Sequence, residues 1–183
     1  WILANLEIFT EGFKNLISYG VLNPLESLLA GSPWYVTVGF VVTLAFLVAG
    51  FRIALLSLSL SLLIVLSGLW YESMLTLTQT IVGTLLTMLV GMALGIWTGR
   101  NDRVEKFLRP FLDAGQTLPA FVYLVPMLGL FGPTRFTAIA TGIVYSIPIV
   151  VKIVCEGIRS VPYSLVEAAT AAGSTTKQII TKV

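Results

Sequence analysis

The sequence is poor in the residues that carry most enzyme chemistry. It contains no histidine and one cysteine, Cys155, and only 11% of its 183 residues are charged. The absence of histidine removes the commonest general base and metal ligand, and a single cysteine forms neither an intrachain disulfide nor a metal cluster. No G-x-x-x-x-G-K-[ST] segment occurs, which excludes a P-loop nucleotide site. We therefore predict that the chain is not an enzyme and carries no metal and no cofactor.

Apolar residues dominate the composition instead. They make up 56% of the chain, and the mean hydropathy is +0.93. A soluble domain has roughly 25% charged residues, so this composition indicates a helical membrane protein. The formal net charge is +2 and no basic tract is present, so no nucleic-acid partner is expected. The start of the chain lacks the basic and apolar regions of a cleavable signal peptide.

Residues 1–33 are predicted to form an amphipathic helix and a loop on the outer side of the membrane. Apolar side chains recur at helical spacing, with polar ones on the other side. The apolar positions are Ile2, Leu6, Phe9, Phe13, Leu16 and Ile17. Such a helix lies at the membrane interface or docks on the membrane domain, or it merely covers the protein's own apolar surface. Asn23-Pro24 and Gly31-Ser32-Pro33 predict loop breaks around a short second helix at residues 25–30.

Residues 34–183 are predicted to form a polytopic all-α membrane domain. The candidate spans are residues 34–49, 53–70, 74–98, 118–131 and 137–154. The first is short, because a bilayer core needs about 20 helical residues. Residues 100–109 are predicted to be a charged loop closed by Pro110. Pro119 and Pro126 interrupt the fourth span, and irregular backbone at membrane depth is tolerated only where it is buried in protein or lines a cavity.

The third predicted span carries a stripe of small residues. Gly83, Thr87, Gly91, Gly95 and Gly99 share one face of the helix. Small residues at this spacing let two membrane helices approach closely. We therefore interpret Gly83, Gly91, Gly95 and Gly99 as helix-packing residues in preference to a substrate path.

The distribution of charge predicts an orientation. With five spans, the segments on the C-terminal side hold nine of the 11 Lys and Arg residues, and the other side holds only Lys14 and Arg135. Cytoplasmic segments carry the positive excess, so the C-terminal side is predicted to be cytoplasmic and the N-terminus outside. None of the acidic residues falls within a predicted span, which argues against a proton-driven carrier.

A short polar segment follows the last span. Glu167-Ala168-Ala169-Thr170-Ala171-Ala172-Gly173 combines helix formers with a glycine that favours a helix end. We predict a helix at about residues 163–178, with Glu167 near its start, where the helix dipole favours a negative charge. Alone, the segment is typical of a small surface helix; on the polar side of a membrane protein it is suited to docking a partner.

This segment resembles the EAA signature of the permease subunits of ATP-binding cassette (ABC) importers. In that family the short helix sits in a groove of the cytoplasmic ATPase and carries its motion into the membrane. The resemblance therefore implies that Glu167, Ala168, Ala169 and Gly173 couple the chain to an ATPase. The family pattern places an aliphatic residue ten positions after the glycine, and Val183 stands there.

A second resemblance lies in Gln116-Thr117-Leu118-Pro119-Ala120-Phe121-Val122-Tyr123-Leu124-Val125-Pro126. This segment is similar to the fourth span of the glycine betaine/proline betaine permeases among the ABC importers. The similarity extends over residues 78–183 and includes Leu94-Gly95-Ile96-Trp97, Arg109-Pro110-Phe111-Leu112-Asp113 and Ile158-Arg159-Ser160-Val161-Pro162. Family members carry about two further spans after the EAA segment, so we expect this chain to be part of a longer subunit.

We take residues of the proline-interrupted span as a candidate translocation path. They are Gln116, Thr117, Pro119, Phe121, Tyr123 and Pro126. A quaternary ammonium group donates no hydrogen bond and binds aromatic faces by cation–π contact, and Phe121 and Tyr123 could supply such faces. The favoured alternative is that these two rings pack against neighbouring helices.

The resemblance implies a complete importer around this chain. Its expected parts are a second permease copy in the bilayer of a bacterial-type inner membrane, cytoplasmic ATPase subunits that hold ATP and Mg²⁺, and a substrate-binding protein, separate or fused. The expected substrate is glycine betaine or a similar quaternary-ammonium compatible solute used in osmoprotection. Choline, carnitine or an amino acid is the alternative substrate. A secondary carrier and a non-transporting scaffold are the alternatives from other functional classes.

Overall fold

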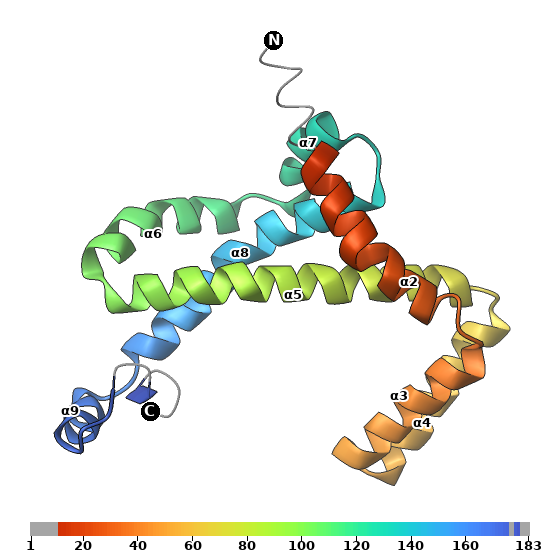
Figure 1. Ribbon diagram of the computed structural model, residues 1–183, viewed down its shortest axis with the longest axis horizontal. Helices are drawn as coiled ribbons and strands as arrows, with labels where there is room; N and C mark the ends of the chain where they lie inside the picture. The colour runs from red at the N-terminus through yellow and green to blue at the C-terminus, as the bar shows by residue number, and fades with distance from the viewer. Residues whose placement is uncertain (1–10, 176–177, 180–183) are drawn as a thin grey trace. The chain divides into compact units, whose positions relative to one another are not determined.

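The computed structural model describes residues 11–175, 178 and 179, and every regular element in them is a helix. The prediction of an all-α protein is confirmed. The chain divides into two compact units: unit 1 comprises residues 1–82 and 130–139, and unit 2 comprises residues 83–129 and 140–183. Figure 1 shows two long helices, α5 (Trp70–Arg100) and α8 (Arg135–Arg159). Each contributes residues to both units.

Unit 1 begins with a helix that runs from Glu11 to Leu29. Its middle is a π-helical turn, η1 (Ser18–Leu22), which leads directly into α2 (Asn23–Leu29). The loop predicted at Asn23-Pro24 is therefore wrong. Pro24 stands in the first turn of α2, where a missing backbone N–H is tolerated, and the π turn before it is closed by the Asn23 N–H and the Ser18 carbonyl.

This amphipathic helix docks only part of its apolar surface on unit 1. Ile17 and Leu22 are buried, and the ring of Phe13 packs edge-on against Phe136 with centroids 5.8 Å apart. Leu16, in contrast, is 67% exposed. The helix thus packs on the protein and also presents apolar side chains outward. Three of the predicted apolar positions, Ile2, Leu6 and Phe9, lie outside the described residues.

Two short helices, α3 (Trp34–Ala49) and α4 (Phe51–Leu66), lie side by side as a hairpin in unit 1 (Figure 1). Gly50 joins them with a φ of +82°, a conformation that favours glycine. Each helix has 16 residues and is about 24 Å long, which is less than the roughly 30 Å of a bilayer core. Because α4 begins at Phe51, Arg52 lies in its first turn and not in a loop.

The described residues contain fewer full-length membrane helices than the five predicted spans. Only α5 and α8, with 31 and 25 residues, are long and apolar enough to cross a membrane on their own. The number rises to four if each of two bent pairs counts as one span: residues 11–29 with α3, bent by 94°, and α6 with α7, bent by 97°. Hydropathy identified the apolar stretches, but it carries no information on where a chain bends.

The charged loop predicted at residues 100–109 is a helix, α6 (Asp102–Thr117), in unit 2. The Asn101 side chain caps it by accepting hydrogen bonds from the N–H groups of Arg103 and Val104 at 3.0 and 3.4 Å. Asp102 and Glu105 add negative charge to its first turn, which the helix dipole favours. The chain then bends at Leu118-Pro119 into α7 (Ala120–Phe131).

In unit 2, α5 and α8 pack in parallel through the glycine stripe. Gly91 faces Val150, Gly95 faces Val154 and Gly99 faces Ile158, in rising order along both helices. A Cβ atom added at Gly91 or Gly95 would lie 2.6 Å from a valine side-chain atom of α8, so only hydrogen fits there. Beside this contact, Val151 is completely buried. Gly83, the first member of the stripe, is half-buried within α5.

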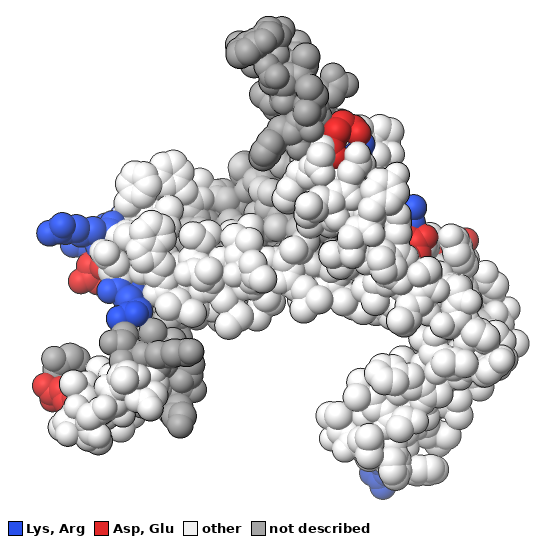
Figure 2. Space-filling model, in the orientation of Figure 1, with Lys and Arg blue, Asp and Glu red and all other residues white. Residues whose placement is uncertain are grey.

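The surface suits a lipid environment. On the face drawn in Figure 2, charged side chains form a few small groups and most of the surface is uncharged. Many exposed residues are large and apolar, for example Phe40, Leu47, Val48 and Leu66 in α3 and α4. Such side chains would be costly to expose to water but not to hydrocarbon.

Candidate functional site

The EAA-like segment forms a short exposed helix, α9 (Tyr163–Ala171). Glu167 and Ala168 are exposed and Ala169 is half-buried. The Leu165 side chain is 52% exposed, so the helix also offers an apolar side chain. Glu167 is the fifth residue of α9 and lies outside its first turn, so the expected interaction with the N-terminal end of the helix dipole is wrong.

The end of α9 is fixed by its glycine. Gly173 has a φ of +80°, its N–H donates to the Thr170 carbonyl at 2.9 Å, and the Ser174 N–H donates to the Ala169 carbonyl at 3.0 Å. This is the Schellman pattern, in which a left-handed residue after the helix satisfies the last carbonyls. A residue other than glycine would be strained in this conformation.

A new helical start follows at Thr175, so the predicted single helix at residues 163–178 is wrong. The Thr175 N–H donates to the Gln178 side-chain oxygen at 2.8 Å, and the Gln178 N–H donates to the Thr175 hydroxyl at 3.4 Å. These reciprocal bonds form a capping box, which marks a helix N-terminus. The Schellman end and the capping box therefore separate α9 from the segment after it.

The six candidate path residues do not converge on one place in unit 2. The Gln116 side chain accepts a hydrogen bond from Lys152 Nζ at 2.9 Å, whereas the Thr117 hydroxyl turns back to the Ala114 carbonyl at 2.8 Å. Pro119 forms the bend between α6 and α7, and Pro126 lies inside α7. The segment is irregular at Pro119, as its prolines predicted.

The two aromatic candidates lie in different environments. The Tyr123 hydroxyl donates to the Gly115 carbonyl at 2.7 Å, and its ring lies 6.3 Å from that of Tyr145. Phe121 is 81% exposed and makes no ring contact of this kind with Tyr123. Tyr123 thus packs within unit 2, while Phe121 faces outward from this chain.

Two ion pairs that link α6 to α8 could not be seen in the sequence. Arg159 Nη2 lies 2.6 Å from Asp102 Oδ1, and Lys152 Nζ lies 2.6 Å from Asp113 Oδ1. They flank a cavity of about 270 Å³ between the ends of α5, α6 and α8, lined in part by Thr98, Leu112 and Cys155. From the sequence alone, Lys152 and Arg159 count only toward the positive excess of the C-terminal side. Their partners lie 39 and 57 residues away along the chain.

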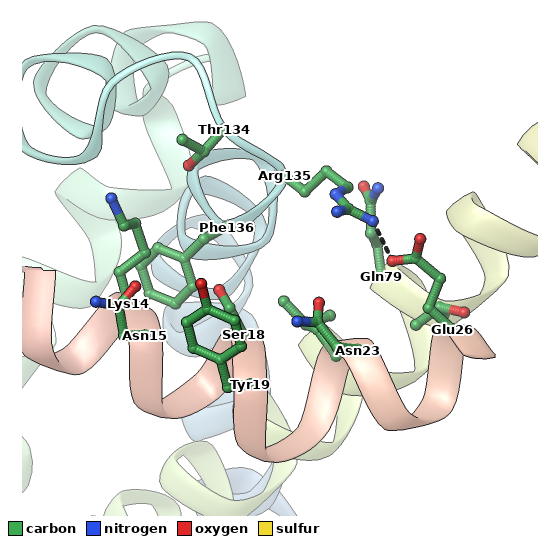
Figure 3. Close-up of a pocket in the computed structure, with 12 residues that line it drawn as sticks. Lys14, Asn15, Ser18, Tyr19, Asn23, Glu26, Gln79, Thr134, Arg135 and Phe136 are labelled. Carbon is green, nitrogen blue, oxygen red and sulfur yellow. Dashed lines mark hydrogen bonds and ion pairs between the residues drawn. The ribbon is translucent and has the colours of Figure 1, made fainter. Parts of the chain in front are cut away.

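A polar pocket in unit 1 was also missed. It has a volume of about 310 Å³ and lies between the Glu11–Leu29 helix, the first turns of α5 and the start of α8. Figure 3 shows the guanidinium of Arg135 paired with the carboxylate of Glu26 at one side of it, and Tyr19, Phe136 and Lys14 toward the other. The signal in the sequence was that Arg135 is one of only two cations in the segments predicted to lie outside.

Within the described residues, no three His, Cys, Asp or Glu side chains gather in a way that could hold a metal ion. The chemistry available in the two units is that of charge pairs, backbone caps and close helix contacts. Such features position and move helices.

Comparison with known proteins decides the family. Residues 91–183 match the family described as binding-protein-dependent transport system inner membrane component. This match covers half of the chain and includes the glycine contacts of α5 and all of α6 to α9. The chain belongs to this family. The resemblance to ABC importer permeases drawn from the sequence is confirmed, and so is the expectation of an inner-membrane protein.

Several curated relatives of this permease family align along the whole chain. It is 32% identical over 183 residues to the glycine betaine/proline betaine transport system permease protein ProW of Escherichia coli, covering all of this chain and 51% of that protein. It is 31% identical over 183 residues to the glycine betaine transport system permease protein OpuAB of Bacillus subtilis, covering 64% of that protein. Identity to the trimethylamine N-oxide transport system permease protein TmoV of Pelagibacter ubique is 32% over 183 residues, covering 26% of that protein. The chain thus spans about half the length of the Escherichia coli permease.

Proposed function

We propose that this chain is the membrane-spanning part of a permease subunit in an ATP-driven importer of glycine betaine or a similar quaternary-ammonium compatible solute. The observation that carries the proposal is the alignment of the entire chain with permease proteins named for glycine betaine and proline betaine transport. In this role the chain is not an enzyme, and hydrolysis of ATP with Mg²⁺ takes place on a partner ATPase. Uptake of such solutes would serve osmoprotection.

The names of the relatives favour a substrate with a fully substituted nitrogen. They include systems for glycine betaine with carnitine and for trimethylamine N-oxide. Such groups carry no N–H, so aromatic faces are suitable contacts, and Tyr123 with Tyr145 is one aromatic pair available in unit 2. A probable D-methionine permease that aligns with 54% of the chain keeps an amino acid as the alternative. Choline and carnitine are alternatives of the same chemical class.

The exposed helix α9 is the proposed contact for the ATPase. Its Leu165 and Glu167 side chains are accessible, and its end is held rigidly by the Gly173 cap. A rigid helix can move as one piece when a bound ATPase changes shape. The further partners we propose are a second copy of the permease, the lipid bilayer and a substrate-binding protein, separate or fused.

We further propose that the α9 side is cytoplasmic and the start of the chain lies outside. The parallel packing of α5 and α8 supports this, because it brings the ends of both helices, Arg100 and Arg159, to one side. That side also carries Arg103, Lys106 and Arg109 of α6, in keeping with the positive excess of cytoplasmic segments. The α3–α4 hairpin returns the chain to the side from which it started, so the orientation does not depend on whether it crosses the bilayer.

The experiment that tests the function is purification of the full-length subunit in detergent with the proteins bound to it. Mass spectrometry identifies those proteins, and ATP hydrolysis is measured with glycine betaine and the binding protein present. A co-purifying P-loop ATPase that both additions stimulate supports the importer. If no ATPase is bound and the subunit alone drives uptake that survives ATP depletion but needs an ion gradient, a secondary carrier replaces it. A subunit that does neither is a scaffold.

A further inference from the structure

Helix α6 is attached to α8 at both of its ends. At its start, Asp102 pairs with Arg159 at 2.6 Å. In its last turns, Asp113 pairs with Lys152 at 2.6 Å, and a Cβ atom added at Gly115 would lie 3.0 Å from the Pro148 ring. The α8 partners fall in number as the α6 residues rise, so the two helices run antiparallel along this contact.

The pair at Lys152 differs from an ordinary surface ion pair in its position. Lys152 lies seven residues before the end of α8 at Arg159, which is about 10 Å into a helix that is long and apolar enough to span a membrane. Charged side chains at such positions are rare, pair with one another and are functional candidates. Lys152 Nζ also donates to Gln116 Oε1 at 2.9 Å, so two groups of α6 hold one cation of α8.

The α6 end of this bridge continues into the proline bend. Gln116 is followed by Leu118-Pro119, where the chain turns by 97° into α7. The Tyr123 hydroxyl donates back to the Gly115 carbonyl at 2.7 Å, so the first turn of α7 is tied to the last turn of α6. A displacement of this part of α6 therefore moves the start of α7 as well.

The α8 end of the bridge leads to α9. Only Ser160, Val161 and Pro162 separate the end of α8 from Tyr163, the first residue of α9. The Ser160 N–H still donates to the Glu156 carbonyl at 2.9 Å, which extends the helical hydrogen bonding into the linker. A force applied to α9 thus reaches α8 through a short connection.

We propose that Lys152, with Asp113 and Gln116, is the positioning group that transmits motion from α9 and α8 to the bend between α6 and α7. The side chains of Lys152 and Asp113 are 30% and 51% exposed in this chain. Within a membrane-spanning helix, separating Lys152 from its partners would leave its charge unpaired, which is unfavourable. The three residues therefore keep this part of α6 moving together with α8. This inference rests on the proposed importer function and assigns residues to its coupling step.

The chain offers a matched control in another ion pair of the same helix. Arg109 Nη1 lies 3.4 Å from Glu105 Oε1, one turn apart within α6. A pair inside one helix joins no second helix, so its loss removes a charge interaction from α6 without detaching α6 from α8. Glu105→Gln is the corresponding control variant.

The test uses the full-length subunit with its ATPase and binding protein in lipid vesicles, and it measures ATP hydrolysis and glycine betaine uptake in parallel. We expect Lys152→Gln and Asp113→Asn each to lower uptake per ATP hydrolysed about tenfold while hydrolysis continues. The charge-exchanged double variant, Lys152→Asp with Asp113→Lys, should recover most of the ratio. Glu105→Gln should keep the wild-type ratio.

Two outcomes of this test would overturn the proposal. One is a wild-type ratio in both single variants. The other is a parallel fall of hydrolysis and uptake that the double variant does not reverse, which would indicate a purely structural role. Loss of protein on purification would show in the yield of each variant, and the double variant separates misfolding from loss of the bridge.

A distance measurement tests the bridge independently of the solute. Spin labels at Lys106→Cys in α6 and Glu156→Cys in α8, in a Cys155→Ser chain, report the α6–α8 separation in the assembled complex with and without ATP. A separation that stays constant in the wild type and changes with ATP in the Lys152→Gln variant supports the proposal. A separation that already changes in the wild type overturns it. If the wild-type complex imports no betaine but the labels behave as expected, the function fails and the bridge stands.

Discussion

Gly95 of α5 lies so close to Val154 of α8 that a methyl group in place of its hydrogen would come within 2.6 Å of the valine Cβ. The carbonyl oxygen of Val151 would be 3.1 Å from the same methyl group. Since one neighbour is a β-branched side chain and the other is backbone, neither can move aside cheaply. The parallel contact of α5 and α8 depends on the absence of a side chain here.

We therefore expect Gly95→Ala to lower the stability of the subunit by about 1–3 kcal/mol, the usual cost of overpacking. Thermal unfolding of the purified protein in detergent measures it. Gly157→Ala is the matched control, because Gly157 is also helical but has nothing within 4 Å of its added Cβ atom. That control should be neutral or slightly stabilising, since alanine favours a helix more than glycine. Equal thermal stability of the two variants would disprove the close contact.

The cap at Gly173 gives a prediction on coupling. Gly173→Asp should strain a residue that has a φ of +80° and add a negative charge at the C-terminal end of α9, which the helix dipole disfavours. Because α9 is the proposed ATPase contact, uptake should fall about tenfold relative to ATP hydrolysis. Parallel assays of hydrolysis and uptake in vesicles measure this ratio.

The variant Gly173→Asn separates the two causes. Asparagine has nearly the same shape as aspartate, tolerates the left-handed conformation and carries no charge. It should retain most of the coupling. Normal uptake in Gly173→Asp would remove the coupling role from the residues Glu167, Ala168, Ala169 and Gly173.

Leu16 and Ile17 are neighbouring aliphatic residues of the N-terminal helix that differ in burial. Ile17 is 7% exposed and Leu16 is 67% exposed. Ile17→Asp should destabilise unit 1 by about 2–5 kcal/mol, because it removes a buried side chain and introduces a charge. Leu16→Asp should leave the melting temperature in detergent nearly unchanged. If both variants unfold at the wild-type temperature, the helix is not docked on the protein.

The sequence alone identified the family, the glycine stripe and the glycine end of α9. Each of these depends on neighbours in the chain or on a fixed spacing, which one sequence displays directly. The start of a new helix at Thr175 could also have been read, since Thr175 and Gln178 have the spacing of a capping box. The interpretation as one long helix gave more weight to helix formers than to this signal.

Helix α6 was missed although its signals were present. Asn101 followed by Asp102 and Glu105 is a sequence typical of a helix start, and Val104, Leu108, Phe111 and Leu112 recur at helical spacing. The interpretation as a loop gives more weight to the charged residues and Pro110 than to these two helix signals. The contact of Asp113 with Lys152 had no such signal, because it joins residues 39 positions apart and depends on the packing of two helices.

The α3–α4 hairpin and the bend at Pro119 explain why the span count was too high. Hydropathy measures how apolar a stretch is, and α3, α4 and α7 are all apolar. Whether a stretch crosses the bilayer depends on its length and direction, and these are set by Gly50 and Pro119. A single sequence marks such residues as breaks without giving the angle of the turn.

The ion pair between Glu26 and Arg135 joins the N-terminal helix to the start of α8 in unit 1. Its side chains are 19% and 54% exposed, so its contribution to global stability should be only about 0.2–1 kcal/mol. Its effect on the local stability of the N-terminal helix should be larger, because among the described residues it is the ion pair that joins this helix to α8. We expect Arg135→Gln to speed amide hydrogen exchange in residues 18–29, measured by mass spectrometry, and added salt to do the same in the wild type by screening the pair.

Glu11→Gln is the control, because Glu11 pairs with Lys14 inside the same helix and its loss should leave exchange in residues 18–29 unchanged. Identical exchange in Arg135→Gln and the wild type would mean that Ile17, Leu22 and Phe13 hold the helix without help from this charge pair.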